Sequence, residues 1–156
     1  MTAILEPSTC YKLGQDLAVA LASTYMLYLK TQNFHWNIED PRFSQLHHLF
    51  QEQYEELAEQ TDEIAERMRM LGQKSPGTMK FFLENSFIQE AAENLSGDEM
   101  IWQLAQDHQA LSKWLLETIK KAQDLGDEGT ADLYIQQLRA HDKQAWMLFS
   151  HHQKKG

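Results

Sequence analysis

Residues 33–72, NFHWNIEDPRFSQLHHLFQEQYEELAEQTDEIAERMRMLG, combine a break in the chain with a long helical pattern that follows it. The break is NIEDP, in which Asp40 can cap a helix and Pro41 suits a first helical turn. Gly72 is a typical stop after the C-terminal end of a helix. We therefore predict a helix that begins near residue 41 and ends at Leu71.

Three kinds of side chain separate onto three faces of this predicted helix when each residue is turned by about 100° from the last. The apolar residues form one stripe, which we expect to face the core of the subunit: Phe43, Leu46, Phe50, Leu57, Ile64 and Met68. A polar stripe runs beside it: His47, Gln51, Asp62 and Glu66. Glutamates occupy the far side: Glu52, Glu56, Glu59 and Glu63. The polar stripe therefore borders the core without being part of it.

The rest of the chain is also predicted to be mostly helical. The other expected helices are about 9–34 with Thr9 as a cap, a short one in TMKFFLENS, one from Ser96 or Asp98 to Gly126, and one from about 130 to 150. The fold class is therefore all-α: a ferritin-like four-helix bundle with a short extra helix in the connection between helices two and three. We expect one domain over residues 1–156, with short tails at about 1–8 and 151–156.

Composition places the chain among acidic globular proteins. Asp and Glu number 23 against 14 Lys and Arg, so the formal net charge is −9. Such a charge disfavours nucleic acid and attracts cations. Cys10 is the single cysteine, so no disulfide can form within the chain, and no apolar run approaches the ~20 residues that span a bilayer. The opening residues lack the pattern of a signal peptide. We therefore expect a cytoplasmic protein with no membrane segment.

The spacing of the polar stripe predicts a site shared by two chains. Gln51 and Asp62 lie about 16 Å apart along one helix, whereas metal ligands lie about 2 Å from the ion. Positions 47 and 66 have the same midpoint as positions 51 and 62. Two antiparallel copies of the helix, related by a two-fold axis at that midpoint, would place His47 opposite Glu66 and Gln51 opposite Asp62.

His35 precedes the break and can meet His47 across the corner between two helices. Two imidazoles with carboxylates suit Fe(II) or Zn(II). A di-iron centre within one bundle uses Glu-x-x-His motifs, and no Glu here has a His three positions later. A histidine in a helical protein is most often a surface or hydrogen-bonded residue, so the spacing alone leaves a structural role open for this set.

Residues 33–72, together with FFLENSFIQE, TADLYIQQL and HDKQAWMLFS further along, closely resemble the Dps family of mini-ferritins over nearly the whole chain. The resemblance implies a hollow homo-dodecamer built from two-fold dimers, with iron sites at the two-fold interface. It implies a ferroxidase that oxidises Fe(II) with hydrogen peroxide or oxygen, stores ferric mineral in the shell and protects against oxidative stress. Many members also bind DNA.

Carried over by position, the resemblance implies that His35 and His47 bind iron together with Asp62 and Glu66 of the two-fold mate, near Trp36. Zinc is an expected competitor. The family usually has Asp or Glu where this chain has Gln51, whose amide is a weaker ligand for a hard cation than a carboxylate. Because of Gln51, the second metal position is expected to be weak. Glu55 lies on the same stripe and could reach the site through water.

Weaker candidates follow from the same resemblance. His48 and Glu52 stand where the family places residues that nucleate mineral, although these glutamates also fit a plain solvated face. Asp127, Glu128 and Asp132 stand in the region of the three-fold pores, although acidic residues are also favoured at a helix N-terminus. The remaining histidines are expected to be structural or at the surface: His108, His141, His151 and His152. The remaining tryptophans are expected to pack in the core: Trp102, Trp114 and Trp146.

Three functions remain to be compared. Iron oxidation and storage is the first. DNA binding and compaction is the second, but no basic residue precedes Lys12, twelve copies at −9 give a shell of −108, and Lys154 and Lys155 are a small counterweight. We therefore expect DNA binding to be weak or absent. The third is a dodecamer whose metal site is weakened by Gln51.

Overall fold

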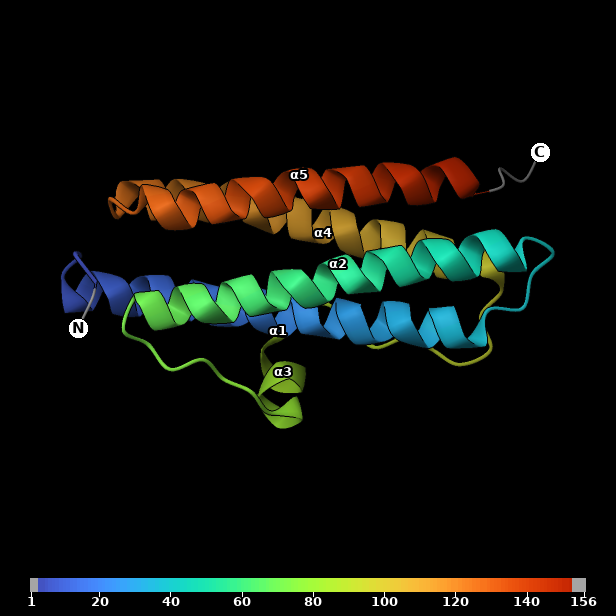
Figure 1. Ribbon diagram of the computed structural model, residues 1–156, viewed down its shortest axis with the longest axis horizontal. Coiled ribbons are helices and arrows are strands. Elements are labelled where there is room, and N and C mark those ends of the chain that lie inside the picture. Colours follow the sequence, from blue (N-terminus) through green and yellow to red (C-terminus); the bar gives the residue numbers. More distant parts are fainter. Residues whose placement is uncertain (1–2, 153–156) are drawn as a thin grey trace.

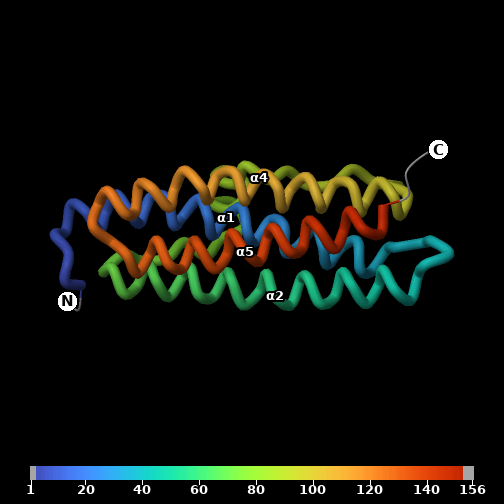
Figure 2. The backbone as a smooth tube through the Cα atoms, turned by 90° about the horizontal axis from the view of Figure 1, so that it is seen from above, coloured from blue at the N-terminus to red at the C-terminus, as the bar shows by residue number. Residues whose placement is uncertain are grey.

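The computed structural model describes residues 3–152, and within that range the chain forms five helices and no strand. They are α1 (Pro7–Asn37), α2 (Phe43–Met70), α3 (Met79–Asn85), α4 (Gly97–Asp124) and α5 (Glu128–His151). The four long helices lie side by side, and α3 lies outside the bundle against α1 (Figures 1 and 2). The predicted bundle, with its short helix between the second and third long helices, is confirmed. No helix among the described residues is long and apolar enough to cross a membrane.

Helix ends differ from the prediction where local polar groups pair differently. α1 begins at Pro7, two residues before the predicted start, so Thr9 lies inside the helix and does not cap it. Asp40 does not cap α2, which begins at Phe43, because its carboxylate accepts hydrogen bonds from Arg42 instead. Ser96 is confirmed as the cap of α4: its hydroxyl accepts from the backbone N–H of Glu99, in a reciprocal capping box.

Arg42 joins three parts of the bundle at the end where α1 turns into α2. Its guanidinium donates to Asp40 at 2.8 Å, to Asp98 at the start of α4 at 2.9 Å, and to the carbonyl of His151 at the end of α5 at 2.5 Å. The hydrogen bonds from Arg42 lower the pKa of Asp40. Gly97 makes room for this cluster, because a Cβ there would lie 2.3 Å from a carboxylate oxygen of Asp40. The corner is therefore anchored to both neighbouring helices.

The core consists of two apolar clusters, one toward each end of the bundle. The residues of the four helices that fall between these clusters are polar and buried: Thr24, Gln60, Ser112, Gln137 and His141. This polar layer includes unsatisfied atoms, among them the amide oxygen of Gln60 and the amide nitrogen of Gln137. The middle of the bundle therefore contains buried polar groups between two apolar clusters.

Two groups of predicted core residues prove to be exposed. Phe43 is 47% exposed, whereas the rest of its stripe on α2 is buried. It is the first residue of α2, at the end of the bundle, and its ring stacks on His47. Trp102 and Trp146 are 44% and 65% exposed, because they lie on outward faces of α4 and α5. Trp114 packs as predicted, against Tyr134 and Phe87.

Candidate metal centre

His35 and His47 meet across the corner between α1 and α2. Their rings stack with centroids 3.8 Å apart and an angle of 15° between the planes. Nδ1 of His35 lies 2.7 Å from the carbonyl oxygen of His47, and Nδ1 of His47 lies 2.7 Å from the carbonyl oxygen of His35. Because a carbonyl only accepts, each Nδ1 must be the nitrogen that donates its hydrogen. The two residues therefore fix each other's orientation.

This reciprocal bonding determines which nitrogen is available for a metal. A neutral imidazole with its hydrogen on Nδ1 has a free lone pair on Nε2. Neither Nε2 has a partner within residues 3–152. In metal-binding histidines, the nitrogen that does not bind the metal usually donates its hydrogen to a carbonyl or a carboxylate. His47 also lines an open groove of about 560 Å³, so ions can approach it from solvent.

The carboxylates of the polar stripe are exposed and unengaged within the described chain. Asp62 and Glu66 are both on the surface of α2 and form no ion pair or hydrogen bond with residues 3–152. Across the same residues, no group of three or more His, Cys, Asp or Glu side chains lies close enough to hold a metal ion. One subunit thus brings together the two histidines but not the carboxylates.

Gln51 and Glu55 are joined to each other on the same helix. The amide nitrogen of Gln51 donates to a carboxylate oxygen of Glu55 at 3.0 Å. This bond turns the amide oxygen of Gln51 away from Glu55 and leaves it as the atom that can bind a cation. Glu55 is therefore a hydrogen-bond partner of Gln51 and does not take its place on the helix.

Aromatic side chains flank the histidine pair on two sides. Trp36 is 61% exposed and makes no ring contact within the described residues. Tyr54 packs edge-on against the His35 ring, with centroids 5.2 Å apart. The sequence analysis missed Tyr54, although it follows His47 by seven residues, which is about two helical turns and hence the same face.

The weaker candidates are placed as follows. His48 and Glu52 are exposed on α2 and pair with each other at 3.2 Å. Asp132 is exposed on α5, and one of its carboxylate oxygens accepts from Gln136. Glu128 is exposed in the first turn of α5.

Asp127 has a structural role. It is 4% exposed, caps α5 by accepting from the N–H of Thr130, and pairs with Arg67 at 2.8 Å. Asp127 thus acts as an acidic residue at a helix N-terminus, which is one of the two interpretations given for it in the sequence analysis. Its partner Arg67 also needs Gly129, where a Cβ would lie 2.8 Å from the guanidinium.

His108 and His141 are structural, as expected. Both are 1% exposed, and their Nδ1 atoms lie 2.9 Å apart between α4 and α5. Burial lowers the pKa of His141 to about 4, and burial together with His141 lowers the pKa of His108. His151 donates from Nδ1 to the carbonyl of Met147.

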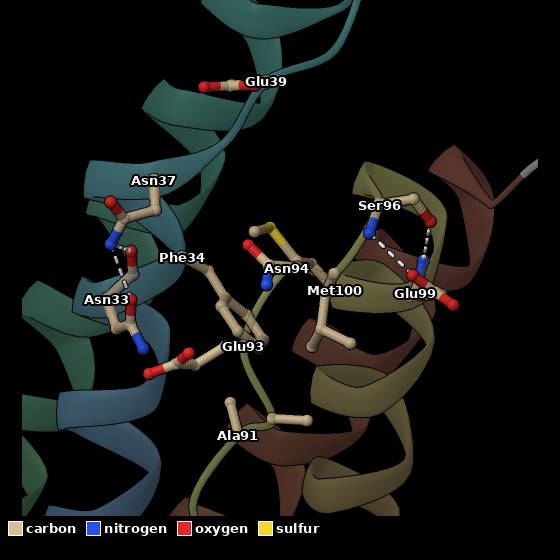
Figure 3. Close-up of a pocket in the computed structure, with 12 residues that line it drawn as sticks. Asn33, Phe34, Asn37, Glu39, Ala91, Glu93, Asn94, Ser96, Glu99 and Met100 are labelled. Carbon is tan, nitrogen blue, oxygen red and sulfur yellow. Dashed lines mark hydrogen bonds between the residues drawn. The ribbon is translucent and has the colours of Figure 1, made fainter.

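A cavity of about 760 Å³ lies beside the bundle near the start of α4 (Figure 3). None of the predicted ligands lines it. Its polar groups belong partly to helix ends: Asn33 bonds to Asn37 near the end of α1, and Ser96 bonds to Glu99 in the capping box. The cavity is therefore separate from the histidine pair in its lining and its chemistry.

Comparison with known proteins agrees with this arrangement. The model of the ferritin-like domain matches residues 15–155. DNA protection during starvation protein 2 of Bacillus anthracis is 39% identical over 128 residues, which cover 82% of this chain and 88% of that protein. The Dps protein of Bacillus brevis superposes with a TM-score of 0.90 at 32% identity, covering 94% of this chain and 98% of that one.

A third relative adds a chemical class. The Dps protein of Vibrio cholerae O1, described as a member of a broad superfamily of ferritin-like diiron-carboxylate proteins, superposes with a TM-score of 0.90 at 29% identity. The match covers 96% of this chain and 95% of that one. By fold and by sequence, the chain belongs to the Dps family of ferritin-like proteins.

Proposed function

We propose that this protein is a ferroxidase that takes Fe(II) as substrate, oxidises it with hydrogen peroxide or oxygen, and stores the ferric product inside a hollow dodecamer, thereby limiting oxidative stress in the cytoplasm. The observation behind the proposal is the reciprocal bonding of His35 and His47. It leaves two stacked imidazoles, one buried and one half-buried, whose Nε2 atoms have no partner within the described residues. Imidazole nitrogens with carboxylate oxygens form a ligand set suited to Fe(II).

The carboxylates come from a second subunit in this proposal. Asp62 and Glu66 are exposed and unengaged in the described chain, and they share the surface stripe of α2 with His47. A two-fold axis near the middle of α2 brings each histidine pair to the carboxylates of the mate and creates two equivalent sites per dimer. Fe(II) bound there would be held by nitrogen on one side and by anionic oxygen on the other.

Gln51 sets the strength of the second metal position. Its amide oxygen is the only group it can offer a cation, because its amide nitrogen is bonded to Glu55. A neutral oxygen in place of a carboxylate lowers the charge of the site, and ligand charge tunes affinity for hard cations. Zinc competes for the same nitrogen and oxygen atoms.

Storage and entry are assigned to the remaining acidic groups. Glu52, with His48, is proposed to start mineral growth on the inner surface, and Asp132 to line the entry pore. DNA binding is not favoured, because a net charge of −9 per chain repels phosphate. The basic residues Lys154 and Lys155 lie outside the described residues.

An intersubunit complementation experiment tests the shared site. One variant has His35→Ala and His47→Ala, and the other has Asp62→Ala and Glu66→Ala. Each alone should fail to oxidise Fe(II) after anaerobic loading and addition of peroxide. Reassembled together, they should recover about a quarter of the wild-type sites, because half of randomly formed dimers are mixed and one of the two sites in each is intact. No recovery, with normal dodecamers, would show that the ligands do not come from two chains.

A further inference from the structure

A continuous row of aromatic rings leads away from the candidate metal centre. Tyr54 on α2 contacts His35 at 5.2 Å between centroids, and Tyr28 on α1 contacts Tyr54 at 5.9 Å. Tyr25 contacts Tyr28 at 5.5 Å and stacks on Phe82 of the neighbouring α3 at 4.7 Å. All of these separations are within the range of direct ring contact. The row therefore joins a proposed metal ligand to α3 without a gap.

We infer that Tyr54, Tyr28 and Tyr25 form a relay that removes oxidising equivalents from the iron site and so protects its ligands. The inference rests on the proposed function, because iron oxidation supplies the oxidant. Tyr54 is the entry point, since it touches His35. Phe82 lacks a phenol group, so the relay ends at Tyr25.

The chemistry balances as single-electron steps. When peroxide takes one electron from Fe(II) instead of two from a pair of ions, the products are Fe(III), hydroxide and a hydroxyl radical. The radical takes a hydrogen atom from the phenol of Tyr54, giving water and a Tyr54 phenoxyl radical. An electron then moves from Tyr28 to Tyr54, while Tyr28 releases a proton to solvent and Tyr54 takes one up. The same exchange moves the radical to Tyr25, where a small thiol donates a hydrogen atom and becomes a thiyl radical.

Packing alone does not account for the three hydroxyl groups. Within residues 3–152 the phenol oxygens of Tyr25 and Tyr54 take part in no hydrogen bond, and that of Tyr28 accepts a 3.3 Å bond from Gln32. Phenylalanine would fill the same space, as it does at Phe82 in contact with Tyr25. All three tyrosines are half-buried, so solvent can exchange the phenol protons while the rings stay packed.

The other two tyrosines provide matched comparisons. Tyr11 is 58% exposed near the start of α1 and has no ring contact with the row within the described chain. Tyr134 is 1% exposed, and burial raises its pKa, as do Asp16 and Asp127. Tyr11→Phe therefore removes a phenol with the same chemistry from outside the relay.

The test follows the radical rather than the rate of iron oxidation. The full-length dodecamer is loaded with Fe(II) without oxygen, mixed with peroxide, freeze-quenched and examined by electron paramagnetic resonance, with peptide mass spectrometry of the products. Wild type should give a tyrosyl signal and oxidised Tyr25, Tyr28 and Tyr54. Tyr28→Phe should lose oxidation at Tyr25 but keep it at Tyr54, with Fe(II) oxidised at the wild-type rate. Tyr11→Phe should match wild type.

Each other outcome counts against the relay in a different way. Normal iron oxidation with no tyrosyl signal would overturn the relay and leave the proposed function standing. Undiminished Tyr25 oxidation in Tyr28→Phe would show independent attack instead of transfer. Oxidation confined to Trp36, and absent from the tyrosines, would place the sacrificial residue outside the row. If wild type oxidises no Fe(II) at all, the proposed function fails and the relay fails with it.

Discussion

The His35–His47 pair on α1 and α2 and the His108–His141 pair on α4 and α5 use the same side chain in opposite ways. In the first pair, each Nδ1 donates to a backbone carbonyl and neither Nε2 atom has a partner within residues 3–152. In the second pair, the two Nδ1 atoms face each other at 2.9 Å, so one donates and the other accepts. In the second pair, the lone pair on one Nδ1 is therefore taken by the other ring, whereas in the first pair the lone pairs on both Nε2 atoms are available for a metal.

The surroundings explain this difference. Around His35 and His47, carbonyls at the corner of two helices supply acceptors, so neither ring needs the other's nitrogen. His108 and His141 are both buried at 1% exposure, and Nε2 of His108 has no partner within the described residues. An unsatisfied buried nitrogen costs about 1–3 kcal/mol unless water reaches it. A pair of histidines is thus informative only together with the acceptors around it.

The largest expected effect is on Fe(II) affinity, which should depend on His35 and His47. His35→Ala or His47→Ala removes a ligand and the carbonyl bond that orients the other ring. We expect Fe(II) affinity to fall by about 100-fold or more, since loss of an orienting partner alone costs 10–100-fold. Anaerobic calorimetric titration measures it. His151→Ala, which removes a histidine bonded within its own helix, is the control. An equal loss in that control would remove the distinction.

The second expected effect is on acid stability and concerns the buried pair. Burial lowers the pKa of His141 from 6.5 to about 4. As pH falls below 6.5, the unfolded chain binds a proton before the folded chain does. The contribution of His141 to the free energy of unfolding is therefore fully present above pH 6.5 and is lost between pH 6.5 and 4. The loss is about 3 kcal/mol from His141. Urea unfolding of His108→Leu/His141→Leu should show a shallower pH dependence than wild type.

Thr24→Val is the control for that experiment, because it removes a buried polar group of the same layer that does not titrate. It should keep the wild-type pH dependence. If the double leucine variant keeps the wild-type slope as well, the acid sensitivity arises elsewhere in the chain.

The third effect is smaller and tests how far Fe(II) binding beside His35 and His47 depends on an added negative charge. Gln51→Glu restores a carboxylate beside the histidines and should raise Fe(II) affinity at the second metal position about tenfold. Repulsion from Asp62 across the axis and from Glu55 should slightly destabilise the metal-free dimer. Gln123→Glu adds the same charge at the opposite end of the bundle as a control. Equal stoichiometry and rates in both would place Gln51 outside the metal site.

The smallest effect comes from a histidine in neither pair. His48 is exposed, and its contact with Glu52 is a surface pair of the i,i+4 type. His48→Ala should change the free energy of unfolding by less than about 0.5 kcal/mol and leave Fe(II) affinity intact. A large loss of affinity in a titration of this variant would mean that His48, not only His47, takes part in binding.

Sequence periodicity was sufficient for the bundle and for the meeting of His35 with His47, because helical phase and a turn of known position determine both. It failed where one side chain chooses between partners. Asp40 was predicted to cap α2, but its carboxylate bonds to Arg42 instead. Phe43 has the spacing of a core residue but lies beyond the end of the core. Tyr54 could have been found from its spacing. The carbonyl bonds of the histidines could not, because backbone acceptors are invisible in a sequence.

The corner between α1 and α2 has a consequence for insertions and deletions. Because each histidine ring is bonded to the backbone of the other, the segment from 35 to 47 is closed on itself, and Arg42 fastens its middle to α4 and α5. One residue more or fewer here would rotate one ring about 100° away from the other. Loops usually tolerate changes in length, but the length of this one determines whether the two rings meet, so it is as constrained as the identity of the histidines.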